Sequence, residues 1–138
     1  MITVEYVENL GDETIEAIDA EFNTYAAQNG VTCDYAPFAF VAKENGAAMG
    51  TLTGHVYYDE VHVSDLIVYK PYRRRSIGRE LMLAVENYYR DKGFAHMALS
   101  TYHFQAPGFY QKCGFQLEFV RENKENPKLS KYFFIKYL

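Results

Sequence analysis

The stretch from residue 68 to residue 79 constrains the fold more than any other, because it joins the end of a strand to the start of a helix. An apolar run at residues 66–68 precedes it, and apolar side chains then recur at helical spacing over residues 77–88. The loop between brings together free backbone N–H groups, a helix N-terminus and the guanidinium groups of Arg73, Arg74, Arg75 and Arg79. Such a loop predicts a bound polyanion.

The overall charge limits what this anion is. The chain has 138 residues, of which 49% are hydrophobic and 23% charged, which is typical of one globular domain with one core. Its net charge of −4 argues against binding nucleic acid by bulk charge. A local basic cluster in an acidic protein indicates a small anionic ligand, and the alternative is an ordinary solvated helix start.

The two cysteines, Cys33 and Cys113, are far apart in the chain and fit neither a metal-site spacing nor a disulfide framework. We therefore expect reduced thiols in a cytoplasmic protein. The chain starts directly with a strand-like segment rather than a signal peptide. No apolar run approaches the roughly 20 residues of a membrane span, so no membrane association is expected.

Hydrophobic periodicity and turn residues predict one α+β domain on a mixed sheet. Asp12 is the expected N-cap of the first helix, which Asn29 and Gly30 end. Asn45-Gly46 predicts a tight hairpin turn, and Gly93 is the expected cap of the second long helix. The expected elements are, in order, an edge strand at 1–7, a helix at 12–28, an antiparallel meander at 38–43, 47–58 and 61–68, a helix at 77–92, a strand at 96–101, a short helix at 107–112, and strands at 115–121 and 131–138.

A second motif follows the basic loop at a distance, in the segment Gln105-Ala106-Pro107-Gly108-Phe109-Tyr110-Gln111-Lys112-Cys113-Gly114-Phe115. The loop itself lacks both the Gly-Lys-Ser/Thr of a P-loop and the glycines of a dinucleotide fingerprint. It resembles the acyl-CoA loop of the GNAT superfamily of N-acetyltransferases, whose pattern is Arg/Gln-x-x-Gly-x-Gly/Ala. Arg73 matches its first residue and Gly78 its last, whereas Ser76 stands where the family prefers glycine.

The second motif is similar to the Ala-x-x-Phe-Tyr-x-Lys-x-Gly-Phe signature at the end of GNAT domains, and the resemblance extends over essentially the full length. It implies a single domain over residues 1–138, with a mixed, mostly antiparallel sheet of six to seven strands, flanking helices and a splayed acyl-CoA cleft. It implies contacts between acetyl-CoA and the following residues: Leu66, Ile67, Val68, Arg73, Arg74, Arg75, Ser76, Ile77, Gly78, Arg79, His103, Ala106, Phe109 and Lys112.

The resemblance further implies acetyl transfer from acetyl-CoA to a primary amine of a small molecule or peptide, by direct attack in a ternary complex and with no metal. Tyr110 matches the tyrosine that serves the departing thiolate. Because tyrosine is ordinarily a weaker acid than a thiol, we expect Tyr110 to act mainly as a hydrogen-bond donor. The alternative is that its ring only packs the short helix on the sheet. A backbone N–H of residues 66–68 is the expected oxyanion donor.

Asp65 is the expected base for the amine, because it lies on the strand where several family members carry an acidic residue. The rival bases are His62, Glu60, His55 and His103. An aromatic and acidic lining would favour a cationic amine as substrate. The residues expected to bind this acceptor amine are Phe22, Tyr25, Tyr35, Tyr57 and Tyr58.

Two other functions fit the same residues. A non-catalytic acyl-CoA sensor on the same fold would leave Ser76 and His103 as marks of a drifting site. A simple nucleotide or phosphate binder would use only the basic loop, and it would give the Phe109-Tyr110 motif no role. Separately, the aromatic residues of the last strand exceed what one sheet face needs, which favours a homodimer through that strand.

Overall fold

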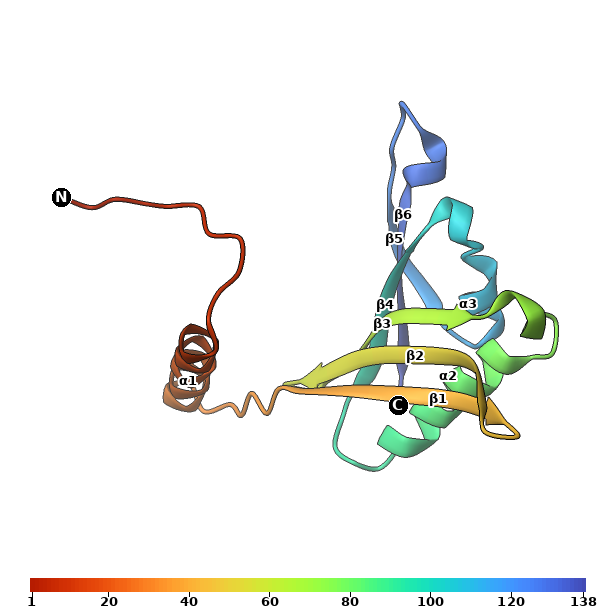
Figure 1. Ribbon diagram of the computed structural model, residues 1–138, viewed down its shortest axis with the longest axis horizontal. Helices are drawn as coiled ribbons and strands as arrows, with labels where there is room; N and C mark the ends of the chain where they lie inside the picture. The colour runs from red at the N-terminus through yellow and green to blue at the C-terminus, as the bar shows by residue number, and fades with distance from the viewer. The chain divides into compact units, whose positions relative to one another are not determined.

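The computed structural model describes residues 1–138 and divides into two units, Met1–Asp34 and Tyr35–Leu138 (Figure 1). The first unit contains helix α1 (Asp12–Gln28), which ends at Asn29 as predicted. Gly11 rather than Asp12 is the N-cap, so Asp12 lies inside the first turn, where a carboxylate is favourable to the helix dipole. The edge strand expected at residues 1–7 is not formed. A strand needs a hydrogen-bonded neighbour, and this unit has no other strand.

The second unit is built on a six-stranded sheet in the order β1-β2-β3-β4-β6-β5. Its first half is the predicted antiparallel meander of β1 (Ala36–Glu44), β2 (Ala47–Tyr57) and β3 (Glu60–Val68). Asn45 and Gly46 join the first two strands with φ values of 51° and 81°, the left-handed pair that a tight hairpin turn requires. The register of β2 against β3 shifts between Thr53 and Gly54, which marks a bulge there.

The second half supplies α2 (Ile77–Tyr89), β4 (His96–Tyr102), α3 (Gly108–Lys112), β5 (Gln116–Arg121) and β6 (Lys131–Tyr137). Single 3-10 turns lie at Lys70–Tyr72, His103–Gln105 and Pro127–Leu129. Helix α2 is shorter than predicted because Arg90 already has an extended backbone, at φ −61° and ψ 139°. Gly93 therefore lies in the following turn, with φ 92°, and is not the helix cap.

The core lies between α2 and the sheet. Helix α2 turns one apolar face inward, and Val85 on that face is fully buried. From the sheet, Leu52, Val61 and Met97 are equally inaccessible, and each such side chain contributes roughly 1.5–3 kcal/mol by leaving water. On β6, Phe134 is buried in the core, while Phe133 stacks on Phe119 at 4.3 Å between ring centroids. The aromatic last strand thus serves both sheet faces, and the homodimer stays a prediction.

Strands β3 and β4 are parallel but pair only briefly. Their ladder joins Glu60, Val61 and His62 to residues 96–98, and it ends there. Strand β3 continues to Val68 and β4 to Tyr102 without pairing to each other. The expected splay is therefore confirmed, and it opens toward α2 and α3. None of the helices combines the length and the apolar character needed to cross a membrane.

Candidate active site

A cleft of about 580 Å³ lies where β3 and β4 have separated. It is bordered by the end of β3, the basic loop, the start of α2, and α3. Its lining residues are Leu66, Ile67, Val68, Tyr72, Arg73, Arg74, Ser76, Ile77, Gly78, Arg79, Gln105, Ala106, Phe109, Tyr110, Lys112 and Cys113. Both sequence motifs therefore meet at one site, although 26 positions separate Arg79 from Gln105 in the numbering.

The basic loop enters α2 through two left-handed residues. Arg74 has φ 66° and Ser76 has φ 60° and ψ 20°. Left-handed dihedrals are those that glycine adopts most easily, which explains the family's glycine at the position of Ser76. The Ser76 hydroxyl makes no capping hydrogen bond, and the first N–H groups of any α-helix lack an intrahelical acceptor. The loop and the N-terminus of α2 together form a site suited to phosphate.

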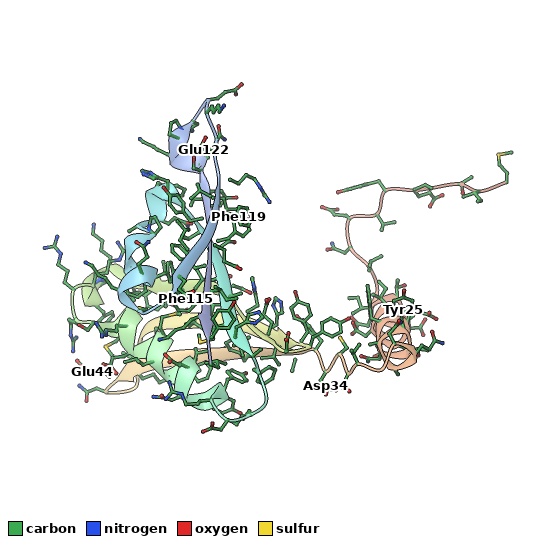
Figure 2. All side chains as sticks on the ribbon, turned by 180° about the vertical axis from the view of Figure 1, so that it is seen from behind. Tyr25, Asp34, Glu44, Phe115, Phe119 and Glu122 are labelled. Carbon is green, nitrogen blue, oxygen red and sulfur yellow. The ribbon has the colours of Figure 1, made fainter.

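The four arginines of this segment do not act alike. The Nε–H of Arg73 donates to the Val68 carbonyl at 3.0 Å and so braces the loop against the end of β3. Arg74 and Arg79 line the cleft as cations. Arg75 instead forms an ion pair with Glu44 (labelled in Figure 2), with 2.6 Å between Nη2 of the arginine and Oε2 of the glutamate. Arg75 therefore does not line the cleft.

Helix α3 forms the opposite wall. The ring of Phe109 packs on Gly78 of α2, and Tyr110 lies against Phe134 with 5.9 Å between ring centroids. Burial raises the pKa of Tyr110 above that of an ordinary tyrosine, and the neighbouring Cys113 adds a smaller effect in the same direction. The phenol therefore keeps its proton and remains a donor. Tyr110 thus both packs α3 on the sheet and lines the cleft.

Asp65 does not line the cleft. It pairs in register with Thr53, whereas Leu66, which does line the cleft, pairs with Leu52, so the two side chains leave opposite faces of the sheet. The Asp65 carboxylate accepts a long hydrogen bond of 3.5 Å from the Thr53 hydroxyl. Any proton that it takes from an amine in the cleft has to pass through the opening between the strands.

Most of the rival bases lie on the face of the sheet from which Asp65 projects, which we call the second face. The rings of His55 and His62 stack with 4.8 Å between centroids. Glu60 lies between His62 and His96, with 3.7 Å to Nδ1 of the first and 2.9 Å to Nε2 of the second. Burial lowers the pKa of His55, the charge of His62 lowers it further, and Glu60 partly opposes both. His103 lies apart beside Tyr132 and does not line the cleft.

The aromatic residues predicted for the acceptor fall into two groups. Phe22 and Tyr25 lie on α1, in the first unit. In the second unit, the rings of Tyr35 and Tyr57 lie 5.3 Å and 5.2 Å from that of His55, and Tyr58 lies 5.5 Å from Tyr57. These three tyrosines form one aromatic row along the second face of the sheet, near the paired end of β3.

Three residues that line the cleft were not predicted. Tyr72 belongs to the 3-10 turn that shapes the basic loop. Gln105 closes the turn after β4, since its Oε1 accepts from the Tyr102 N–H at 3.1 Å. Cys113 ends α3, and burial raises the pKa of its thiol. All three lie inside or beside the two motifs, so proximity in sequence was the available signal.

The chain is similar to known acetyltransferases. A model of the acetyltransferase (GNAT) family matches residues 4–115. Blasticidin-S acetyltransferase from Streptomyces morookaense is 31% identical over 118 residues, covering 85% of each chain. An acetyltransferase structure from Bacillus cereus matches with a TM-score of 0.76 at 27% identity, over 97% of this chain and 98% of its own.

A GNAT family acetyltransferase from Elizabethkingia anophelis, solved with acetyl-CoA bound, has a TM-score of 0.65 at 15% identity, over 92% of this chain and 85% of that one. At that identity the match shows a shared fold alone. In the present structure, no group of three or more His, Cys, Asp or Glu side chains is arranged to hold a metal ion.

Proposed function

The chain is a member of the GNAT family of acetyltransferases, and from this premise we propose that it transfers an acetyl group from acetyl-CoA to a primary amine of a small molecule or peptide. The observation that carries the proposal is the cleft between the splayed strands, which is lined by a phosphate-suited loop and by the partly buried phenol of Tyr110. The free cysteines Cys33 and Cys113 are consistent with action in the cytoplasm.

The proposed cofactor pose follows from the free hydrogen-bonding groups. The pyrophosphate would lie on the N-terminus of α2, with Arg74 and Arg79 as counter-charges. Beyond His62, β3 forms no ladder with β4, so its backbone groups on that side are available to the amides of the pantetheine arm. This pose would deliver the thioester to the point where the strands part, near Tyr110.

The proposed reaction is direct attack of the neutral amine nitrogen on the thioester carbonyl carbon. A backbone N–H of residues 66–68 would donate to the oxyanion of the tetrahedral intermediate. As the C–S bond breaks, the Tyr110 hydroxyl would donate to the departing thiolate, and its raised pKa makes a hydrogen bond a better description than full proton transfer. The attacking nitrogen loses one N–H proton and the departing thiolate takes up one proton, so the products are the acetylated amine and CoA as its free thiol.

Asp65 is the proposed receiver of the proton lost by the amine. It lies on the second face, so we propose that the proton reaches it through water at the opening. His62 and Glu60 stand on the same face and are the alternatives. Replacing Asp65 by Asn distinguishes them, because loss of the base should shift the acidic limb of the pH profile of kcat/KM, whereas loss of a surface carboxylate should not.

The experiment that tests the proposal measures free CoA thiol released from acetyl-CoA in the presence of an amine panel. The panel holds a polyamine, an aminoglycoside, a peptide with a free amine and blasticidin S, after which the Streptomyces relative is named. Release without any amine is the control. Binding of acetyl-CoA without turnover of any amine would instead favour the sensor function.

A further inference from the structure

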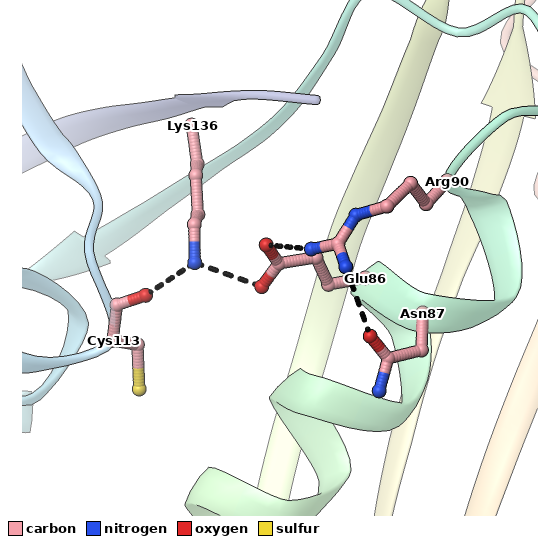
Figure 3. Close-up of polar contacts among 5 residues, drawn as sticks. All are labelled: Glu86, Asn87, Arg90, Cys113 and Lys136. Atoms are coloured by element: carbon pink, nitrogen blue, oxygen red, sulfur yellow. Dashed lines mark hydrogen bonds and ion pairs between the residues drawn. The ribbon is translucent and has the colours of Figure 1, made fainter.

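The side chain of Lys136, on β6, connects two elements that form the walls of the cleft (Figure 3). Its ammonium donates to the carbonyl oxygen of Cys113 at 2.8 Å and to Oε2 of Glu86 at 2.8 Å. The other oxygen of Glu86 accepts from Nη2 of Arg90 at 2.7 Å. Lys136 therefore ties the end of α3 to the last turn of α2.

The position of Glu86 makes this contact firm. Glu86 is 9% exposed, and it lies on α2 next to Val85, which is fully buried. A carboxylate with so little water is unfavourable unless cations replace the lost hydration. Lys136 and Arg90 supply those cations, one to each oxygen. Removing either cation leaves one oxygen of this buried carboxylate without its partner, so the link differs from an exposed surface ion pair.

The chain at Gly114 is shaped around Lys136. Gly114 has φ 91°, and a β-carbon placed on it would come within 3.1 Å of Nζ and 3.2 Å of Cε of Lys136. Glycine is thus favoured twice, for its left-handed backbone and for the room that the lysine occupies. The Cys113 carbonyl is one of those at a helix C-terminus that lack an intrahelical donor, and the lysine supplies one.

A second contact holds the other end of α3, where the Phe109 ring packs on Gly78. Along α2, Gly78 and Glu86 are about 12 Å apart at 1.5 Å per residue. The link also borders the cleft directly. A small cavity of about 110 Å³ is lined by Glu86 and Lys136 together with three residues that also line the cleft, Arg79, Lys112 and Cys113.

We propose that Lys136 is a positioning residue: with Glu86 it holds α3 at a fixed distance from α2 and so sets the width of the cleft and the place of Tyr110. The inference rests on the proposed function in one respect only: CoA is taken as the ligand, and its affinity is used to measure the width of the cleft. The geometric part concerns α3 itself, and it can be measured without any ligand.

The ligand-based test is the Kd of CoA by calorimetry for the wild type and for Lys136→Met, which keeps the apolar stem and removes the ammonium. We expect affinity to fall roughly 3- to 30-fold, the size of effect carried through packed networks. Lys136→Arg, which keeps a donor cation, should recover most of the loss. Lys124→Met is the matched control, because Lys124 is exposed and makes none of these contacts.

The ligand-free test measures how fast the Cys113 thiol reacts with a disulfide reagent, in a Cys33→Ser background that leaves one thiol. Lys136→Met should speed the reaction several-fold as α3 loosens. Loss of the lysine charge by itself should raise the pKa of the thiol and slow the reaction, so acceleration reports opening rather than electrostatics. Val56→Ala, a core truncation on β2, controls for a general loss of stability.

The outcomes separate the two proposals. A wild type that does not bind CoA contradicts the proposed function, and the thiol rate still decides the role of Lys136. Wild-type binding with an unchanged Kd in Lys136→Met contradicts the positioning role. A lower Tm in Lys136→Met, with a thiol reaction no faster than in Val56→Ala, also contradicts the positioning role, because this result shows only a general loss of stability. If Lys136→Met does not fold, Glu86→Gln breaks the same ion pair and takes its place in the CoA test, where an unchanged Kd contradicts the positioning role. It does not serve in the thiol test, because the charge of Glu86 raises the pKa of the Cys113 thiol and its loss alone would speed the reaction.

Discussion

The ring of Phe109 lies against the Cα of Gly78, and a β-carbon at position 78 would come within 3.2 Å of its Cζ. Positions 76 and 78 of the loop therefore have different physical requirements. Position 78 needs room, because α3 packs on it, whereas position 76 needs a left-handed backbone, at φ 60°. The family pattern, with glycine at the position of Ser76 and glycine or alanine at that of Gly78, therefore combines two separate physical requirements.

Gly78→Ala should weaken CoA binding by about 1 kcal/mol, because the new methyl group displaces Phe109 from the wall of the cleft. The better helix propensity of alanine, about 1 kcal/mol, should offset the crowding in overall stability. Calorimetry and thermal unfolding measure the two effects. Gly108→Ala is the control, since a β-carbon there meets nothing within 4 Å. Equal CoA affinity in both variants would show that the Phe109 contact does not shape the cleft.

Ser76→Gly should raise the free energy of unfolding by up to about 1 kcal/mol. Glycine relieves a left-handed residue of roughly 1–2 kcal/mol, and the greater freedom of glycine in the unfolded chain takes part of that back. Urea unfolding measures this, with Asp91→Gly as a control at a similar φ of 64° away from the cleft. CoA affinity should be unchanged or higher, and a clear loss in this variant alone would make the Ser76 hydroxyl a ligand of the cofactor.

The meander and the loop–helix unit could be predicted because their signals are local. Asn45-Gly46 specifies its turn by backbone preference, and the apolar face of α2 specifies a helix by spacing. The strand expected at residues 1–7 was wrong for the complementary reason. Alternating residues can favour an extended chain, but a strand exists only beside a partner, and the pattern carries no information about that partner.

The site was predictable as two motifs, but the direction of each side chain was not. Nothing local to Arg75 shows that Glu44, thirty-one positions earlier, takes its guanidinium away from the cleft. Asp65 was placed on the correct strand with its side chain directed away from Leu66, but which of the two faces lines the cleft depends on the bulge after Thr53 and on the register of β2. Lys136 was missed altogether, because its link to Glu86 spans fifty positions and belongs to no motif.

Tyr110→Phe should lower kcat by roughly 10- to 100-fold while leaving the KM for acetyl-CoA close to the wild-type value. The ring keeps its packing against Phe134, so thermal stability should change little. Tyr72→Phe is the matched control, because it removes a hydroxyl from another residue that lines the cleft. Steady-state kinetics separate the two, and an equal effect in both variants would remove the special role of Tyr110.

His55 should make the folded state less stable as the pH falls. Burial and then the charge of His62 lower its folded-state pKa, so below the ordinary histidine value of 6.5 the unfolded chain binds a proton that the folded protein resists. The stabilisation is present above that value and is lost as the pH decreases through the folded-state pKa. His55→Gln should therefore flatten the fall in unfolding free energy between about pH 7.5 and pH 5.

His62→Gln should flatten this fall partly, because the stacked ring 4.8 Å away is the second cause of the shift in the His55 pKa. His103→Gln, beside Tyr132, is the control. An unchanged slope in His55→Gln would mean that water screens the pair completely and that the stacked rings have no effect on stability.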